Sequence, residues 1–128
     1  MRIFKNKAFT RFAKKSWIDD ASLCKAIRDA ERGLLDADLG GGVIKQRVAR
    51  IGGGKLGGFR TLILFRIGIL AFFVHGFAKN EQANIDDDEL VALRKLAAVM
   101  LDYDDATLCR ALENKTLIEV ICDEKTIP

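Results

Sequence analysis

The stretch from Val43 to Lys79 constrains the fold of this chain more than any other. It contains three runs rich in β-branched and aromatic residues, separated by a glycine-rich loop and by a short turn. Such runs favour β-strands, and short connections favour pairing of neighbours as hairpins. The sequence therefore predicts three successive antiparallel strands, at residues 43–50, 59–66 and 70–77.

The first of these strands carries basic side chains in an ordered way. Successive side chains of a strand point to opposite faces of the sheet, so Lys45 and Arg47 share one face. The chain has no acidic residue between Val43 and Arg60. The basic residues of this stretch are Lys45, Arg47, Arg50, Lys55 and Arg60. We therefore expect a cationic face on the sheet, with Arg60 entering it at the start of the second strand.

The loop Ile51–Gly58 contains five glycines and Lys55. Glycine lets backbone N–H groups approach an anion closely. The loop does not fit the Walker spacing, which requires lysine followed by serine or threonine at the start of a helix. A nucleotide-hydrolysing site is therefore a poor interpretation, and a flexible hairpin loop explains the glycines more simply.

The residues before the sheet predict a short edge strand and two helices. Residues 2–5 are a short apolar piece, and Asn6 can cap a helix in which Phe9 and Phe12 recur at helical spacing among basic residues. The basic face of that helix is either an ordinary solvated surface, which we favour, or a nucleic-acid contact. Asp19 or Asp20 caps a second helix, whose apolar face holds Leu23, Ile27, Ala30 and Leu34.

The residues after the sheet predict two further helices and a last strand. Asp86 and Glu89 have the spacing of a capping box, which explains the run of aspartates better than a metal site does. Asp104 or Asp105 caps a fourth, short helix, and residues 116–121 alternate like a strand. The prediction is an α+β fold, with a small antiparallel-dominated sheet and a central three-strand meander. An N-terminal helical hairpin and the C-terminal helices pack on this sheet, in a single domain over residues 1–128.

Charge is distributed unevenly along the chain. Residues 1–85 carry 16 basic and 7 acidic residues, whereas residues 86–128 carry 5 basic and 11 acidic ones. The first two thirds of the chain therefore favour an anionic partner.

The cysteine and histidine content predicts neither a disulfide framework nor a metal site. Cys24, Cys109 and Cys122 are widely spaced, and His75 is the only histidine. Zinc sites need about four clustered ligands, so we expect no metal and no cofactor. Reduced thiols, together with the lack of a signal peptide or of an uninterrupted apolar run of spanning length, predict a cytoplasmic protein without a membrane partner.

A basic sheet without metal ligands suggests RNA as the ligand. Cleavage of RNA needs a base near the 2′-hydroxyl, cations around the phosphate and an acid for the leaving oxygen. Lys45, Arg47, Arg60 and Lys79 are the candidate catalytic residues, and a lysine among like charges loses its proton more readily. His75, inside the third strand, is expected to be a packed imidazole. Further contacts to RNA are assigned to Arg50, Lys55 and Arg66.

Two motifs carry a resemblance to a known family. GGFRTL opens the middle strand, and HGFAKNEQANI closes the third. With the order of elements, they resemble the RelE/ParE superfamily of toxins from type II toxin–antitoxin modules, in its RelE-like and HigB-like branch. The resemblance covers residues 2 to about 100.

The resemblance implies metal-independent, ribosome-dependent cleavage of mRNA, in which the 2′-oxygen attacks the adjacent phosphate. Lys45 and Arg47 match the two basic residues of the strand before the loop. Arg60 matches the arginine that stabilises the phosphate, and Lys79 matches the basic residue after the third strand. The RelE pattern has a tyrosine where this chain has Ile85. The implied partners are the ribosome, mRNA and an antitoxin with a DNA-binding helix-turn-helix.

Two alternatives remain open at the level of sequence. One is a non-enzymatic toxin of the ParE kind, which acts on DNA gyrase through protein contacts. The other is a catalytically inactive domain that binds RNA or an antitoxin. The basic residues around Arg60 favour RNA, because a gyrase-binding toxin has no need of an anion-binding face.

Overall fold

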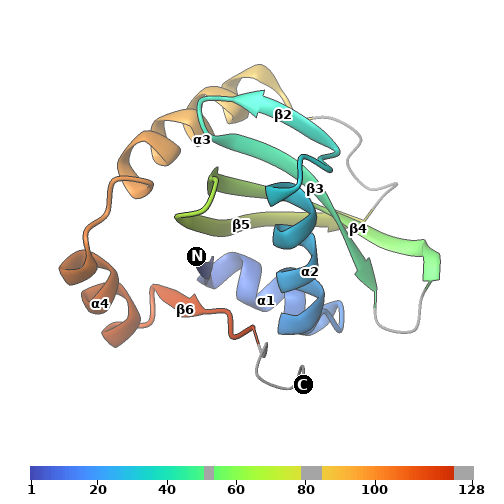
Figure 1. Cartoon of the computed structure of the whole chain (residues 1–128), viewed down its shortest axis with the longest axis horizontal. Coiled ribbons are helices and arrows are strands. Elements are labelled where there is room, and N and C mark those ends of the chain that lie inside the picture. The colour runs from blue at the N-terminus through green and yellow to red at the C-terminus, as the bar shows by residue number, and fades with distance from the viewer. Residues whose placement is uncertain (51–53, 79–84, 123–128) are drawn as a thin grey trace.

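A computed structural model describes residues 1–50, 54–78 and 85–122, without the side chains of residues 50 and 54–57. One mixed sheet runs through this part of the chain, in the order β2-β3-β4-β5-β1-β6 (Figure 1). Its strands are β1 (Arg2–Asn6), β2 (Ala37–Gly40), β3 (Val43–Arg50), β4 (Gly54–Arg66), β5 (Leu70–Ala78) and β6 (Leu117–Glu119). The helices are α1 (Lys7–Lys15), α2 (Asp20–Glu31), α3 (Asp87–Met100) and α4 (Asp105–Glu113).

The predicted meander of β3, β4 and β5 is confirmed, but it is part of a larger sheet. β2 adds an antiparallel strand beside β3, in a segment between the second helix and the meander for which no strand was predicted. β1 pairs in parallel with β5 and antiparallel with β6. The prediction that β1 lies at an edge is therefore wrong, because the last strand covers its outer side.

The second strand of the meander begins earlier than predicted. β4 starts at Gly54, so residues 54–58 continue the ladder that the sequence assigned to a loop. Arg50 pairs with Gly54 after a register shift near the end of β3. Residues 51–53 of the predicted loop lie outside the described residues.

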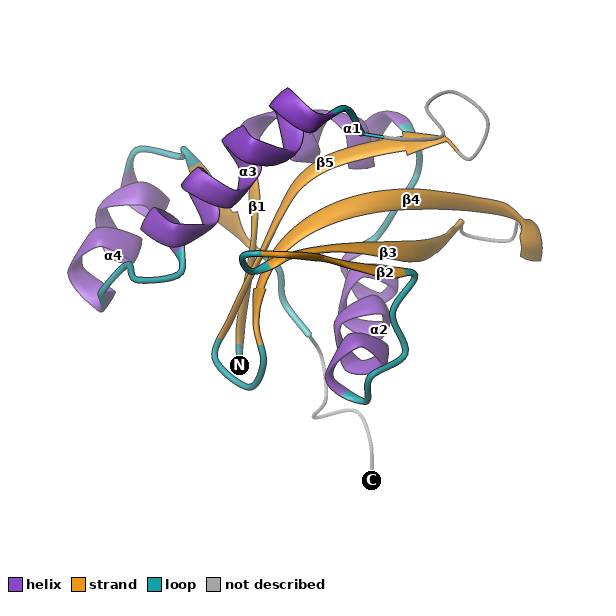
Figure 2. Cartoon of the chain, turned by 90° about the horizontal axis from the view of Figure 1, so that it is seen from above, coloured by secondary structure: helices purple, strands orange, loops and turns teal. Residues whose placement is uncertain are grey.

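The sheet has an apolar core on each face. α1 and α2 cover one face, where Phe9 and Leu23 pack on strand residues such as Ile63. α3 and α4 contribute to the core of the other face, where Ala97 of α3 packs with strand residues such as Leu64. Figure 2 shows α2 and α3 on opposite sides of β3 and β4. We call the side covered by α3 the α3 face.

Side-chain caps fix the starts of the helices as the sequence predicted. The side chain of Asn6 accepts a hydrogen bond from the Phe9 N–H, and Asp86 does so from the Glu89 N–H. At the two starts that the sequence left open, Asp19 caps α2 and Asp104 caps α4. Leu34 does not join the apolar face of α2, because it follows the end of the helix and is 55% exposed.

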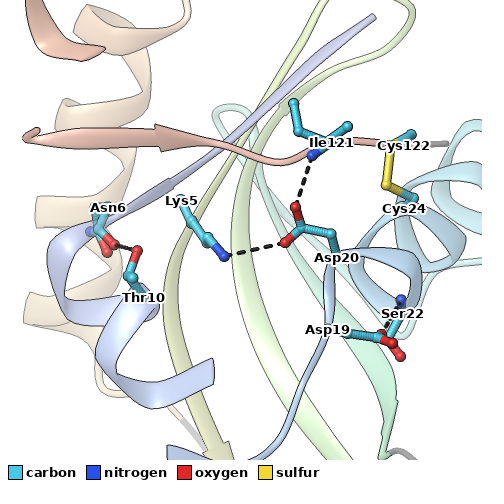
Figure 3. A network of polar contacts seen from close by, with 9 residues as sticks. All are labelled: Lys5, Asn6, Thr10, Asp19, Asp20, Ser22, Cys24, Ile121 and Cys122. Atoms are coloured by element: carbon cyan, nitrogen blue, oxygen red, sulfur yellow. Dashed lines mark hydrogen bonds and ion pairs between the residues drawn. A yellow bond between two sulfur atoms is a disulfide. The ribbon is translucent and has the colours of Figure 1, made fainter. Parts of the chain in front are cut away.

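The C-terminal segment is fastened to α2 and β1 (Figure 3). One carboxylate, that of Asp20, accepts hydrogen bonds from Lys5 Nζ at 3.2 Å and from the Ile121 N–H at 2.9 Å. Beside it, Cys24 and Cys122 form a disulfide, with Cα atoms 5.8 Å apart. The prediction of reduced thiols is therefore wrong for these two cysteines. The fold brings together residues 98 positions apart, and sequence spacing could not show this.

Candidate active site

Three predicted site residues meet on the α3 face. In the β3–β4 pairing, Lys45 lies opposite Leu62 and Arg47 lies opposite Arg60. Directly paired residues share a face of the sheet, and Leu62 packs in the core under α3. We call Lys45, Arg47 and Arg60 the basic cluster.

Asp36, just before β2, holds two members of the basic cluster. Its Oδ2 atom lies 3.1 Å from Arg60 Nε and 3.8 Å from Lys45 Nζ. Three cations and one carboxylate leave the cluster with a formal charge of +2 (3 − 1). Asp36 was not predicted as a site residue, because it lies outside the basic stretch and reaches the cluster only through the pairing of β2 with β3.

A buried glutamine fixes the backbone of Asp36. Gln46, 4% exposed, accepts a hydrogen bond from the Asp36 N–H at 3.3 Å. Its amide nitrogen donates to the carbonyls of Ala26 at 3.0 Å and Leu34 at 2.9 Å. The turn after α2 is therefore tied to β3, and the Asp36 carboxylate is presented to the basic cluster by a rigid support.

Arg60 has an unused donor. Its Nη1 atom is buried, and among the described residues it has no hydrogen-bond partner. A buried donor without an acceptor is costly, more so when it is charged. Such a donor suits an anionic ligand that enters the site and accepts its hydrogen bond.

The position of the Arg47 side chain depends on a glycine of the neighbouring strand, Gly58. Gly58, two residues before Arg60, leaves the space in which the Arg47 side chain lies, since a Cβ atom at Gly58 would stand 2.8 Å from Arg47 Nε. The glycine in front of the aromatic–arginine motif therefore accommodates the neighbouring arginine.

A β-bulge brings His75 to the same face. β5 pairs Leu62 with His75 and Ile63 with Phe73, so Val74 is the extra residue. Uninterrupted alternation from Phe73 would place His75 on the same face as Phe73, under α1 and α2. The bulge instead places it opposite Leu62 on the α3 face, where it is half-buried and its ring lies 5.8 Å from that of Phe77.

Two rows of side chains therefore cross the sheet. Lys45, Leu62 and His75 form one row, and Arg47, Arg60 and Phe77 form the next. Adjacent strands are about 4.8 Å apart, so Lys45 and His75 start about 10 Å apart on either side of Leu62. A phosphate bound at Arg60 would be reached from two sides by groups that can carry a proton. No sequence pattern predicts the bulge that places His75 there.

The remaining predicted residues are not part of this arrangement as described. Arg66 lies at the other end of β4, where it donates to the Leu101 carbonyl at 2.7 Å and pairs with Asp102 at 3.2 Å. It lies six positions along the strand from Arg60, which is about 20 Å. The side chains of Arg50 and Lys55, and Lys79 as a whole, lie outside the described residues.

Comparison with known proteins identifies the family. A family model described as the RelE toxin of the RelE / RelB toxin-antitoxin system matches residues 1–120. The chain belongs to this family. No curated protein sequence matches it.

Membership makes the chain a RelE-type toxin of a toxin–antitoxin system, with an antitoxin as its partner. The match extends beyond the 100 residues of the predicted resemblance, to the end of β6. Within the described residues, no group of three or more metal-ligating side chains lies close enough to hold a metal ion. No described helix is long and apolar enough to span a bilayer.

Proposed function

We propose that this RelE toxin inhibits translation as a ribosome-dependent endoribonuclease that cuts mRNA. The observation that carries the proposal is the buried Nη1 of Arg60 in the basic cluster, which has no hydrogen-bond partner in the part of the chain that the structure describes. A phosphate oxygen is the acceptor that such a donor fits, and charge-assisted hydrogen bonds of this kind are strong. The proposed ligands are mRNA and the ribosome.

The reaction would be a transfer within the RNA backbone. The 2′-oxygen attacks the adjacent phosphorus, the bond to the 5′-oxygen breaks, and the products are a 2′,3′-cyclic phosphate and a 5′-hydroxyl. Arg60 and Arg47 would stabilise the negative charge that builds on the phosphate. These steps need proton transfer and positive charge. In this proposal, Arg47 and Arg60 supply the positive charge, and Lys45 and His75 transfer the protons.

We assign the proton transfers to Lys45 and His75, which lie on either side of Leu62. Lys45 would take the proton from the 2′-hydroxyl, and His75 would donate one to the leaving 5′-oxygen. Imidazole suits this task because its ring nitrogens can accept and donate protons. Lys79, the basic residue after β5, is a further proposed catalytic residue, and Arg50, Lys55 and Arg66 are proposed RNA contacts.

The antitoxin that pairs with this toxin would cover the active site while the toxin is inactive. A helix-turn-helix DNA-binding antitoxin is the partner that the HigB-like branch implies, and a cytoplasmic location follows from a ribosomal target. An acidic segment of the antitoxin laid on the basic cluster would offer an acceptor to Arg60 Nη1, which has none among the described residues.

The test is to map new mRNA 5′ ends in a translation extract, with Arg60→Ala beside the wild-type toxin. We expect cuts inside translated regions, absent with Arg60→Ala and absent when initiation is blocked. Arg110→Ala, which removes an exposed arginine of α4, is the matched control and should cut like wild type.

Three results would overturn the proposal. Cuts that persist without translation would indicate a ribosome-independent nuclease. Growth arrest without cuts, accompanied by loss of supercoiling activity of purified gyrase, would indicate a ParE-like toxin. If neither arrest nor cuts occur although the circular dichroism spectrum is that of a folded protein, the chain is an inactive binding domain.

A further inference from the structure

The solvent side of α1 carries a stripe of basic residues. Lys7, Arg11, Lys14 and Lys15 follow the spacing i, i+4, i+7 and i+8, which places them on one side of a helix, and all four are exposed. The opposite side, with Phe9 and Ala13, is buried in the core. The helix contains no acidic residue. We call the four basic residues the α1 stripe.

Lys14 and Lys15 suit the last turn of α1, where the helix dipole favours cations, but the stripe also carries costs for the helix. Like charges at i, i+4 repel, as Lys7 and Arg11 do, and Arg11 and Lys15. Lys7 also stands in the first turn, where the helix dipole disfavours a cation and where α1 has no acidic residue. Within the described residues, none of the four forms a salt bridge. A surface with these costs is suited to an anionic partner.

Trp17, two residues after the end of α1, adds an exposed aromatic ring beside the stripe. Trp17 has φ = 58° and is 74% exposed. The Ile18 N–H donates to the Ala13 carbonyl at 2.9 Å, which closes the helix around Trp17 in a left-handed conformation. Glycine is the usual residue there, because a side chain in this conformation is strained.

The other helices show that tryptophan is not needed for this turn. α2 ends in the same way with Gly33 at φ = 81°, where the Leu34 N–H donates to the Asp29 carbonyl at 2.9 Å. α4 does so with Lys115 at φ = 63°. Trp17 is therefore both strained and exposed, and packing does not explain its presence at the end of a basic stripe.

We propose that the α1 stripe and Trp17 form a second RNA-binding surface, in which the stripe contacts phosphates and Trp17 stacks on an unpaired base. Cationic side chains that follow a backbone, beside an aromatic ring, are how proteins bind single-stranded RNA. A membrane is a poorer partner, because the apolar side of α1 is already buried and cannot enter lipid. The proposal holds whether or not the basic cluster cuts RNA.

The position of α1 relates this surface to the active site. Phe12 packs edge-on against Phe59 of β4, with ring centroids 5.5 Å apart, and its ring also lies against Gly76 of β5. Phe59 directly precedes Arg60, whose side chain points to the other face of the sheet. The two surfaces therefore lie at the same end of the sheet on opposite faces, and an RNA longer than the active site can contact both around that end.

Trp17 is the only tryptophan of the chain, so its fluorescence reports on this surface alone. We would titrate Arg60→Ala protein, which should not cut its ligand, with a 12-nucleotide oligoadenylate carrying a fluorescein label. Quenching of Trp17 with the same midpoint as the rise in fluorescein anisotropy is the expected result. Binding should also weaken with salt, because phosphate contacts release counterions.

Variants separate the stripe from the ring. Lys14→Glu with Lys15→Glu should lower the affinity at least tenfold and reduce the salt slope by about 1.4, since each contact to a single strand contributes about 0.7. Arg28→Glu with Lys95→Glu makes the same change in net charge on α2 and α3 and should have a much smaller effect. Trp17→Gly should lower the affinity by about 5- to 100-fold, whereas Lys115→Gly, at the equivalent turn of α4, should leave it unchanged.

Several outcomes would overturn the inference. Binding without a change in Trp17 emission would place RNA elsewhere, and so would equal losses in the two charge-reversal pairs. If polyglutamate or anionic vesicles quench Trp17 as strongly as the oligoadenylate does, the surface binds an acidic protein or a membrane instead. None of these results bears on the cleavage proposal, which the mapping of mRNA ends decides by itself.

Discussion

Arg47 of β3 and Arg60 of β4 lie directly opposite each other on the α3 face. Like charges in such a pair repel, and the repulsion is destabilising. Asp36 offsets it for Arg60, and Gly58 gives Arg47 the space in which its side chain lies. The pair is therefore held together by its surroundings, and a bound phosphate would relieve the repulsion that remains.

Asp36→Asn should slow cleavage without weakening RNA binding. The carboxylate orients Arg60 and Lys45 but also competes with phosphate for them, so kcat should fall by about 10- to 100-fold while KM stays level or falls. The free energy of unfolding should drop by about 1 kcal/mol, because all three groups keep some exposure. Single-turnover cleavage and urea unfolding measure the two effects.

Asp102→Asn is the control for Asp36→Asn, since it removes the exposed ion pair with Arg66. It should change the free energy of unfolding by less than about 0.5 kcal/mol and leave cleavage intact. A higher KM in Asp36→Asn, with kcat unchanged, would show that Asp36 acts in binding rather than in orienting the basic cluster.

His75→Ala should reduce kcat by about 10²- to 10⁴-fold, the usual contribution of a general acid or base. Added imidazole should restore part of the activity, because it can enter the space left by the ring. A merely packed His75 would give a variant that unfolds at lower temperature and gains nothing from imidazole.

The direction of the proton transfer can be tested with a modified mRNA. A sulfur atom in place of the 5′-leaving oxygen departs without protonation, so His75→Ala should cut this substrate nearly as fast as wild type. The Lys45→Met variant should stay slow on it, since the 2′-hydroxyl still needs a base. The reverse pattern would exchange the roles of the two residues.

Gly58→Ala should mainly reduce cleavage, whereas Gly76→Ala should mainly reduce stability. A Cβ atom at Gly58 meets the mobile end of Arg47, so the protein should lose less than about 1 kcal/mol of stability while cleavage falls. A Cβ atom at Gly76 overlaps the packed ring of Phe12, and the overpacking should cost about 1–3 kcal/mol. Thermal unfolding and cleavage assays compare them, and equal loss of stability in both would contradict the described role of Gly58.

Cys122→Ser should lower the free energy of unfolding by about 2–4 kcal/mol, because the disulfide with Cys24 closes a long loop of the unfolded chain. A reductant should destabilise the wild-type protein by a similar amount and the variant not at all. Cys109→Ser is the control, since Cys109 is an exposed free thiol. Urea unfolding with and without reductant makes the comparison. If reductant leaves the free energy of unfolding of the wild-type protein unchanged, the disulfide does not form in solution.

Cys109 should react slowly with alkylating agents for an exposed thiol. The hydrogen bond from its Sγ to Glu113 Oε1, 3.5 Å long, raises the pKa of Cys109, and the nearby negative charge acts in the same direction. A raised pKa means less thiolate at a given pH, and the thiolate is the reactive form. Glu113→Gln should therefore speed alkylation by iodoacetamide and shift its pH profile downward; an unchanged profile would contradict the contact.

Much of the fold follows from local patterns in the sequence. The caps at Asn6 and Asp86 and the alternation around Lys45 and Arg47 are properties of a few neighbouring residues, and the structure has them where predicted. The basic cluster was predicted for the same reason, since two of its members lie on one strand.

The features that the sequence did not predict depend on distant partners. β2 is a four-residue strand that exists because β3 offers it a ladder, and with it comes Asp36. The bulge at Val74 depends on the register between β4 and β5, and it decides which face His75 joins. The disulfide and the central place of β1 depend on the return of the chain at β6.

That return also sets an order for the synthesis of the protein. β1 is made before its two neighbours, residues 70–78 and 117–119, so each of its edges stays unpaired until the strand that covers it has left the ribosome. Contacts between such distant segments form slowly. The nascent toxin therefore completes this sheet only after β6 has been made, which leaves a period in which β1 and the apolar core are open to aggregation or to capture by another chain.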